Sequence, residues 1–178
     1  GKGEEPMHKR ISESATQLRV NEELMDLDNR AGKSGGGFCT SFPVYERPYI
    51  FANFNGTDHD VTVLTHEAGH AFQCYMSRKQ PINRYLWPTY EACEIHSMSM
   101  EFFAYPWMNR FFREDEQKYK FSHLSGSISF LPYGAAIDEF QHFIYENPNI
   151  SIEERNNGWL AIEKKYDLAS DKERNSYL

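Results

Sequence analysis

The chain has 178 residues, of which 40% are hydrophobic and 15% aromatic, and its formal net charge is -7. This composition is typical of a folded globular chain and argues against intrinsic disorder. The negative charge and the lack of a Lys/Arg cluster exclude nucleic acid as an expected partner. No apolar run approaches the roughly 20 residues that a membrane-spanning helix needs, so no membrane partner is expected either.

The N-terminal third predicts one helix followed by two short strands. The helix is expected from Ser14 to Arg30 because its apolar residues recur at helical spacing, and the glycines that follow would end it. The strands are expected from Gly37 to Phe42 and from Pro48 to Phe54, the second being rich in the aromatic residues that strands favour. We expect these two strands to form a small antiparallel sheet. The apolar positions of the predicted helix are Leu18, Leu24, Met25 and Leu27.

The middle of the chain predicts two long helices. The first runs from His59 to about Lys79, and Thr57 or Asp58 in the preceding turn is its expected N-cap. The second follows Pro81 and Pro88 and continues to Phe112. Because proline lacks the N–H that a helix interior requires, we expect this helix to bend at Pro106.

The last third predicts three more helices. Two of them are expected at Glu114 to Leu124 and at Pro132 to Tyr145, with Pro132 in the first turn, where proline is tolerated. A Ser151–Glu154 capping box opens the last helix, which is expected to end near Tyr166. With no repeats and no low-complexity linker, residues 1–178 are predicted to form a single, mainly α domain.

Two histidines four residues apart in the first long helix predict a zinc site. Residues at this spacing differ by about 40° in direction and about 6 Å along the axis, so His66 and His70 can bind one Zn²⁺ from the same face. Glu67 lies one position along, where the general base for metal-bound water belongs. Gly69 costs about 1 kcal/mol relative to Ala in a helix interior, which indicates a close approach of another element. In the competing interpretation, the motif is a helix-packing accident without metal.

Zinc needs a third protein ligand. The metzincin pattern would have a His six residues after His70, but that position is Met76. Glu91, Glu94 and Glu101 of the next helix are the other candidates, and because they share roughly one helix face, helical geometry leaves all three open. His96 points about 200° away from Glu94 and is expected to be a core or surface residue.

Four blocks of the sequence carry a family resemblance. They are residues 21–27, Gly35–Thr40, Thr65–Phe72 and Glu94–Glu101, and residues 131–134 through 145–148 add a fifth, less specific match. Together they resemble oligoendopeptidase F and its relatives in the thimet-oligopeptidase family of zinc peptidases. The resemblance implies a zincin-like helical domain that holds one Zn²⁺ per chain.

The resemblance also implies roles for individual residues. It selects Glu94 as the third zinc ligand beside His66 and His70, and makes Glu101 a second-shell or structural carboxylate. It places the glycine-rich strand with Gly36 and Gly37 beside the cleft, where an exposed strand edge could pair with the backbone of a peptide substrate. In the alternative interpretation, these glycines only end a helix and form a bulge.

Members of this family are several times longer than 178 residues, so the chain is expected to be part of a longer oligopeptidase catalytic domain. The His and Tyr that stabilise the family's transition state lie downstream of the part matched by residues 175–178, and neither His123 nor Tyr133 is assigned that role. If the chain ends at Leu178, we expect it to bind zinc, to cleave peptides slowly and to self-associate through uncovered apolar surface.

Two functions follow from these expectations. In the first, the chain is a zinc-dependent endopeptidase for short peptides, in which Glu67 takes a proton from water and passes it to the leaving amine. In the second, it is a zinc-binding fragment or remnant with little turnover, completed by another chain or segment. Peptide specificity and oligomeric state are not predicted by any pattern in the sequence.

The cysteines and the N-terminal residues predict the cellular compartment of the protein. Cys39, Cys74 and Cys93 are odd in number and form no C-x-x-C pair, so a disulfide framework is not expected. The segment from Gly1 to Pro6 contains no apolar signal-peptide core. We therefore expect a cytoplasmic protein whose thiols are buried and unreactive.

Overall fold

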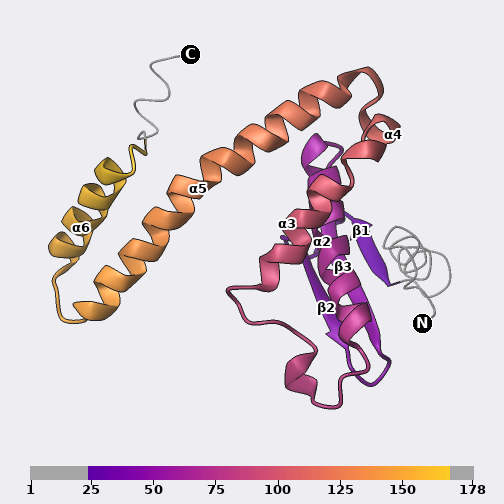
Figure 1. Ribbon diagram of the computed structural model, residues 1–178, viewed down its shortest axis with the longest axis horizontal. Helices are drawn as coiled ribbons and strands as arrows, with labels where there is room; N and C mark the ends of the chain where they lie inside the picture. Colours follow the sequence, from indigo (N-terminus) through magenta and orange to yellow (C-terminus); the bar gives the residue numbers. More distant parts are fainter. Residues whose placement is uncertain (1–23, 169–178) are drawn as a thin grey trace, which may run out of the picture. The chain divides into compact units, whose positions relative to one another are not determined.

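The computed structural model describes residues 24–168, which divide after Glu116 into two compact units (Figure 1). The first unit contains a three-stranded sheet, the helices α2 and α3, and several short helical turns. The second unit contains the long helix α5 and the helix α6. This fold confirms the prediction of a mainly helical protein with one small sheet.

The sheet contains the two predicted strands and one that was not predicted. Strand β2 (Phe38–Phe42) pairs antiparallel with β3 (Arg47–Phe54), as expected, and β1 (Met25–Asp28) pairs with the other side of β3 in parallel. The order β1-β3-β2 makes the sheet mixed and leaves β2 at an edge among the described strands.

The helix predicted from Ser14 to Arg30 is wrong in its described part, because Met25–Asp28 is β1; its residues up to Glu23 lie outside the described range. Leu24, Met25 and Leu27, which had suggested a helix face, instead pack on the core formed by Ile50 and Ala71. Backbone pairing with β3 extends to Leu24, whose carbonyl accepts a hydrogen bond from the Ile50 N–H at 2.9 Å. Long-range pairing has overridden the local helical pattern.

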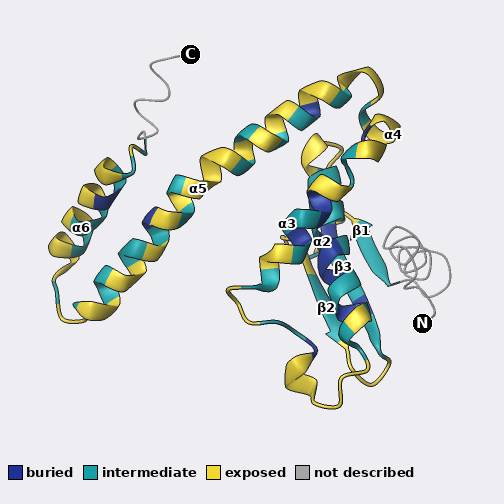
Figure 2. Cartoon of the chain, viewed as in Figure 1, coloured by how far each residue is buried: buried dark blue, intermediate teal, exposed yellow. Residues whose placement is uncertain are grey.

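Helix α2 (Asp58–Ser77) forms the centre of the first unit. It contacts β2, β3 and helix α3 (Cys93–Phe103), and its N-cap is Thr57, one of the two predicted caps. Buried residues gather where these elements meet (Figure 2). A Cβ added at Gly69 would lie 2.5 Å from the Ser97 Cα, so only glycine lets α2 and α3 approach this closely. The close approach indicated by Gly69 is therefore confirmed.

The second predicted long helix is shorter and more broken than expected. The segment after Pro81 forms only a 3-10 turn, η1 (Asn83–Tyr85), and α3 begins at Cys93. The helix does not bend at Pro106 as predicted, because α3 already ends at Phe103 and Pro106 lies in the turn that follows. The short elements that follow are η2 (Tyr105–Trp107), α4 (Asn109–Phe112) and η3 (Arg113–Asp115).

In the second unit, α5 (Glu116–Glu146) is one helix where two were predicted. Pro132 lies inside it and not in a first turn; one proline removes a single backbone hydrogen bond, and the helix continues through it. Helix α6 (Ile152–Lys165) has the predicted capping box between Ser151 and Glu154. None of the helices within residues 24–168 combines the length and apolar character that a bilayer-spanning segment requires.

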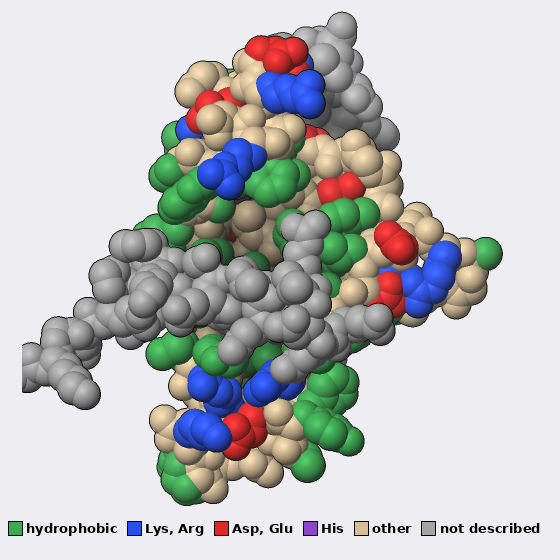
Figure 3. Space-filling model, turned by 90° about the vertical axis from the view of Figure 1, so that its right-hand side faces the viewer, with side chains coloured by type: hydrophobic (Ala, Val, Ile, Leu, Met, Phe, Trp, Pro, Cys, Tyr) green, Lys and Arg blue, Asp and Glu red, His purple; other side chains and the backbone are tan. Residues whose placement is uncertain are grey.

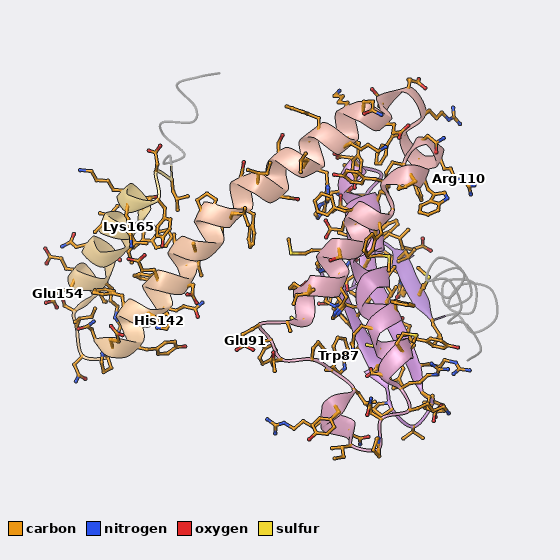
Figure 4. The ribbon with its side chains drawn as sticks, in the orientation of Figure 1. Trp87, Glu91, Arg110, His142, Glu154 and Lys165 are labelled. Atoms are coloured by element: carbon orange, nitrogen blue, oxygen red, sulfur yellow. The ribbon has the colours of Figure 1, made fainter. Side chains whose placement is uncertain are left out.

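Helix α6 packs against the C-terminal half of α5 through side chains. The rings of Phe140 and Trp159 meet edge to face with centroids 5.3 Å apart. Lys165 and Tyr166 both bind the Glu139 carboxylate, at 2.7 and 2.8 Å. The labelled Glu154, Lys165 and His142 mark this hairpin in Figure 4. Large hydrophobic side chains stay exposed on both units, and one face of the molecule shows them beside charged ones (Figure 3).

Candidate metal centre

Three of the predicted ligands converge between α2 and α3. The His66 Nε2 and the His70 Nε2 lie 2.9 and 3.4 Å from the same oxygen, Oε2 of Glu94. One donor atom from each of the three residues lies within 4.8 Å of the others. Two imidazole nitrogens and a carboxylate oxygen are the donor types of catalytic zinc sites, which leave the fourth position open.

The structure separates the three carboxylates that helical spacing could not distinguish. Glu94 faces both histidine Nε2 atoms, whereas the Glu101 Oε1 lies 2.6 Å from the Nδ1 of His66, on the far side of that ring. Glu91 is exposed, lies before α3 near Trp87 (Figure 4), and lines the cleft without joining the three converging ligands. The arrangement leaves the Nε2 of His66 available for metal and ties its Nδ1 to a carboxylate, as outer-shell partners do in zinc sites.

The Glu94 carboxylate is held by its own helix. The hydroxyl of Ser97, which is fully buried, donates a hydrogen bond to the Glu94 Oε2 at 2.8 Å. Because Ser97 lies directly against Gly69, the same close approach of α2 and α3 fixes the distance between the histidines and the carboxylate. Ser97 was not singled out in the sequence, where a serine three residues after a glutamate carries no distinctive signal.

His96 was predicted to be a core or surface residue, and it is not among the three converging ligands. It is partly buried, and its Nε2 lies 3.3 Å from the Nδ1 of His70. The two helices approach so closely at Gly69 that a side chain on this part of α3 also reaches α2. Gly69 indicated that some element approaches α2 closely, but no pattern in the sequence showed that α3 is this element or that His96 would reach His70.

Glu67 lies beside the ligands, in a buried position. Its side chain is 7% exposed, and its Oε2 has no hydrogen-bond partner among the described residues. Burial raises the pKa of Glu67, and the Glu94 charge raises it further, while the neighbouring His66 and the backbone of Cys39 act in the opposite direction. A carboxylate with a raised pKa and a free buried oxygen can serve as a general base.

The two histidines have opposite electrostatic environments. Burial lowers the pKa of His66, but the hydrogen bond and charge of Glu101 outweigh it, so the pKa is raised overall. Burial lowers the pKa of His70, and the charge of Glu94 does not compensate. His70 is therefore ready to bind metal in its neutral form, whereas protons compete more strongly with metal at His66.

The two glycines assigned to the cleft differ from each other. Gly37 lies against the site, since a Cβ there would be 3.9 Å from the Glu67 Oε1 and 3.6 Å from the Phe51 carbonyl oxygen. Gly36 has no neighbour within 4 Å of such a Cβ, but its φ of +95° favours glycine. Gly37 thus fits the cleft interpretation, whereas Gly36 lies in a bend before β2.

A cleft of about 1120 Å³ opens beside the metal ligands. The edge strand β2 contributes Phe38 and Cys39, and the loop before α3 contributes Trp87 and Tyr90. Phe38 is 47% exposed and Tyr90 95%, so the wall is aromatic and accessible in the described part of the chain. The cleft has the size and the mixed apolar and polar lining of a site for a small molecule or peptide.

The cysteines and two further residues complete the comparison with the predictions. All three cysteines are free; Cys74 is buried, as expected, whereas Cys39 and Cys93 are only partly buried. A hydrogen bond with Cys74 and burial raise the pKa of Cys39, which makes it a poor nucleophile. His123 and Tyr133 lie on α5, in the second unit.

The chain is similar to a known protein family and to several solved structures. The sequence profile of Peptidase family M3 matches residues 6–177. A crystal structure assigned as oligoendopeptidase F from Bacillus anthracis str. Ames is 58% identical, with a TM-score of 0.81 over 90% of this chain and 30% of that one. A structure of PZ peptidase A with an inhibitor is 55% identical, with a TM-score of 0.83 over 96% of this chain and 31% of that one.

A more distant structure, a peptidase from Chlamydophila abortus, shares the fold at 20% identity and a TM-score of 0.63. The chain spans about 30% of the length of the oligoendopeptidase F and PZ peptidase A structures. A search of curated proteins found no match.

Proposed function

The chain belongs to peptidase family M3, and from that premise we propose that it forms the metal-binding part of a zinc-dependent endopeptidase acting on short peptides. The observation that supports the proposal is the convergence of His66, His70 and Glu94 within 4.8 Å of one another, beside the buried carboxylate of Glu67. Buried polar atoms are normally hydrogen-bonded, so a Glu67 with a purely structural role would be expected to have a partner for its Oε2.

The donor set fits zinc. The three ligands supply two nitrogens and one oxygen, from His66, His70 and Glu94. The Glu101 carboxylate contacts the Nδ1 of His66, the ring nitrogen that does not face the metal position. When bound, Zn²⁺ acts as a Lewis acid that polarises a peptide carbonyl and acidifies water. One Zn²⁺ per chain is therefore part of the proposal.

Glu67 moves the proton in the proposed reaction. Its carboxylate accepts a proton from the attacking water and later donates it to the leaving amine of the cut peptide bond. Burial helps, because the raised pKa brings the carboxyl closer to the working pH and makes both transfers accessible. The free Oε2 provides the accepting atom.

The edge strand β2 positions the substrate in this proposal. Its outer side has no strand partner among the described residues, so a peptide in extended conformation can pair with its backbone. Gly37, directly before β2, has no side chain that could stand between the backbone there and the Glu67 carboxylate. Binding through backbone groups gives affinity with little sequence preference, which suits an enzyme for varied short peptides.

The test compares Glu67→Gln with Glu91→Gln in zinc-loaded protein, using a quenched fluorescent peptide of about eight residues. Glu67→Gln should keep its zinc and lose at least about 100-fold in hydrolysis rate, because the amide cannot accept the proton. Glu91→Gln changes an exposed carboxylate outside the metal-binding group and should keep most activity. Full turnover in metal-loaded Glu67→Gln would contradict the assignment. Zinc binding without hydrolysis in the unmutated protein would favour the alternative of a binding unit that needs another segment.

A further inference from the structure

We propose that His96 is a positioning residue for the metal centre: its Nε2 accepts a hydrogen bond from the Nδ1–H of His70 and thereby fixes the orientation and tautomer of that ligand. The inference rests on the proposed zinc function and extends it to a residue outside the ligand set. It is carried by the contact between the two rings, whose nitrogens lie 3.3 Å apart.

The His96 ring meets the His70 ring edge to face. The ring centroids of His70 and His96 are 5.4 Å apart, and the ring planes are inclined by 79°. His96 stands on α3 at the point where that helix is pressed against α2, since its backbone oxygen would be 2.8 Å from a Cβ at Gly69. The position of the His96 ring is therefore set by the helix crossing and not by a flexible loop.

The chemistry of the ligand allows only one direction for this hydrogen bond. A histidine that binds metal through Nε2 needs the lone pair of that atom, so the neutral ring carries its proton on Nδ1. The Nδ1 of His70 is then a donor, and the Nε2 of His96 must accept, with the proton of His96 on its own Nδ1. One hydrogen bond thus selects the metal-binding tautomer of His70.

The two ligand histidines receive different support. His66 rests on the carboxylate of Glu101 at 2.6 Å, whereas His70 rests on an imidazole. Glu67, Glu94 and Glu101 already bring three carboxylates to a site meant for a dication. A neutral acceptor at His96 orients the second ligand without adding a fourth negative charge, which would further weaken the Lewis acidity of the metal.

The experiment measures zinc affinity by competition with a chromophoric chelator in the unmutated chain and in three variants. His96→Ala should bind zinc about 10- to 100-fold more weakly, as is typical when an outer-shell partner is lost. His96→Gln should recover most of that loss, because its amide oxygen can accept from the Nδ1–H of His70. His59→Ala changes an exposed histidine of α2, the helix that carries His70, and this variant should bind zinc like the unmutated chain.

Thermal unfolding of the metal-free variants separates positioning from folding. Comparable unfolding temperatures combined with weaker zinc binding in His96→Ala would support the inference. It would be overturned by unchanged affinity in His96→Ala, or by a His96→Gln variant that folds yet binds as weakly as His96→Ala. Failure of the unmutated chain to bind zinc would instead overturn the proposed function on which the inference rests.

Discussion

The α2–α3 pair and the α5–α6 hairpin each join two helices, but by different means. At α2–α3 the backbones themselves meet at Gly69, and the interface buries polar side chains. At α5–α6 the contact is made by ring edges and by the exposed Glu139–Lys165 ion pair. Within residues 24–168, the buried polar and charged residues all lie on α2 and α3; they are Glu67, His70, Ser97 and Glu101.

Burial of polar groups costs free energy unless they are paired, so their concentration in one helix pair indicates a purpose other than stability. The hairpin buries Ala136 and Ile162 and follows ordinary packing rules. We infer that the packing of α2 on α3 serves to hold the metal-binding side chains in place, whereas the packing of α5 on α6 serves only to stabilise the hairpin. Substitutions in the first pair should change metal binding, and those in the second should not.

The largest contrast is expected from the histidines. His66→Ala or His70→Ala should abolish measurable zinc binding, since each removes one of only three protein donors. His142→Ala in α5, where the ring is exposed, should have no effect. Zinc content after dialysis, measured by mass spectrometry, checks both. Equal loss of zinc in the His142 variant would mean that the two helix pairs are not functionally distinct.

A somewhat smaller effect is expected at the carboxylates. Glu94→Ala should weaken zinc binding by more than the roughly 10- to 100-fold that is typical of an outer-shell partner, and Glu101→Ala should fall within that range. Glu91→Ala should leave zinc affinity unchanged. Chelator competition gives all three values. A larger loss for Glu101→Ala than for Glu94→Ala would reverse the roles assigned to these two residues.

Two helical glycines should respond to alanine with opposite signs. Gly69→Ala places a methyl group 2.5 Å from the Ser97 Cα and should destabilise the fold by about 1–3 kcal/mol or more while weakening zinc binding. Gly126→Ala, in open space on α5, should stabilise it by up to about 1 kcal/mol. Urea unfolding measures both. A neutral Gly69→Ala would show that the close helix approach is not required.

The smallest effect is expected at the cap of α6. Ser151→Ala removes the capping hydrogen bond to the Glu154 N–H and should lower the free energy of unfolding by about 1 kcal/mol. Zinc affinity should not change, because the cap belongs to the hairpin. Urea unfolding and chelator competition on the same preparation provide the comparison, and a coupled loss of zinc would contradict the independence of the two regions.

The sequence was most informative where the signal is local. The helix with His66, Glu67 and His70, the capping box at Ser151 and the two antiparallel strands were all predicted, because spacing and turn residues encode them directly. Gly69 also indicated a close approach of another element, because glycine in a helix interior costs free energy relative to alanine. These features depend on residues within one or two turns of each other.

The remaining features depend on contacts between distant segments. Strand β1 exists because it pairs with β3, and neither the helical spacing of its residues nor their propensity reveals a partner. Helical geometry could not choose among Glu91, Glu94 and Glu101, and it did not reveal that His96 would lie against His70. Both questions are decided by the crossing of α2 and α3, which no local pattern specifies.

The most direct test of the metal centre is an anomalous diffraction measurement at the zinc absorption edge, on crystals of the zinc-loaded protein. We expect one strong peak per chain, about 2.0–2.2 Å from the Nε2 of His66, the Nε2 of His70 and a carboxylate oxygen of Glu94. A peak elsewhere, or one at this position with Glu91 or Glu101 in place of Glu94, would contradict the proposed centre.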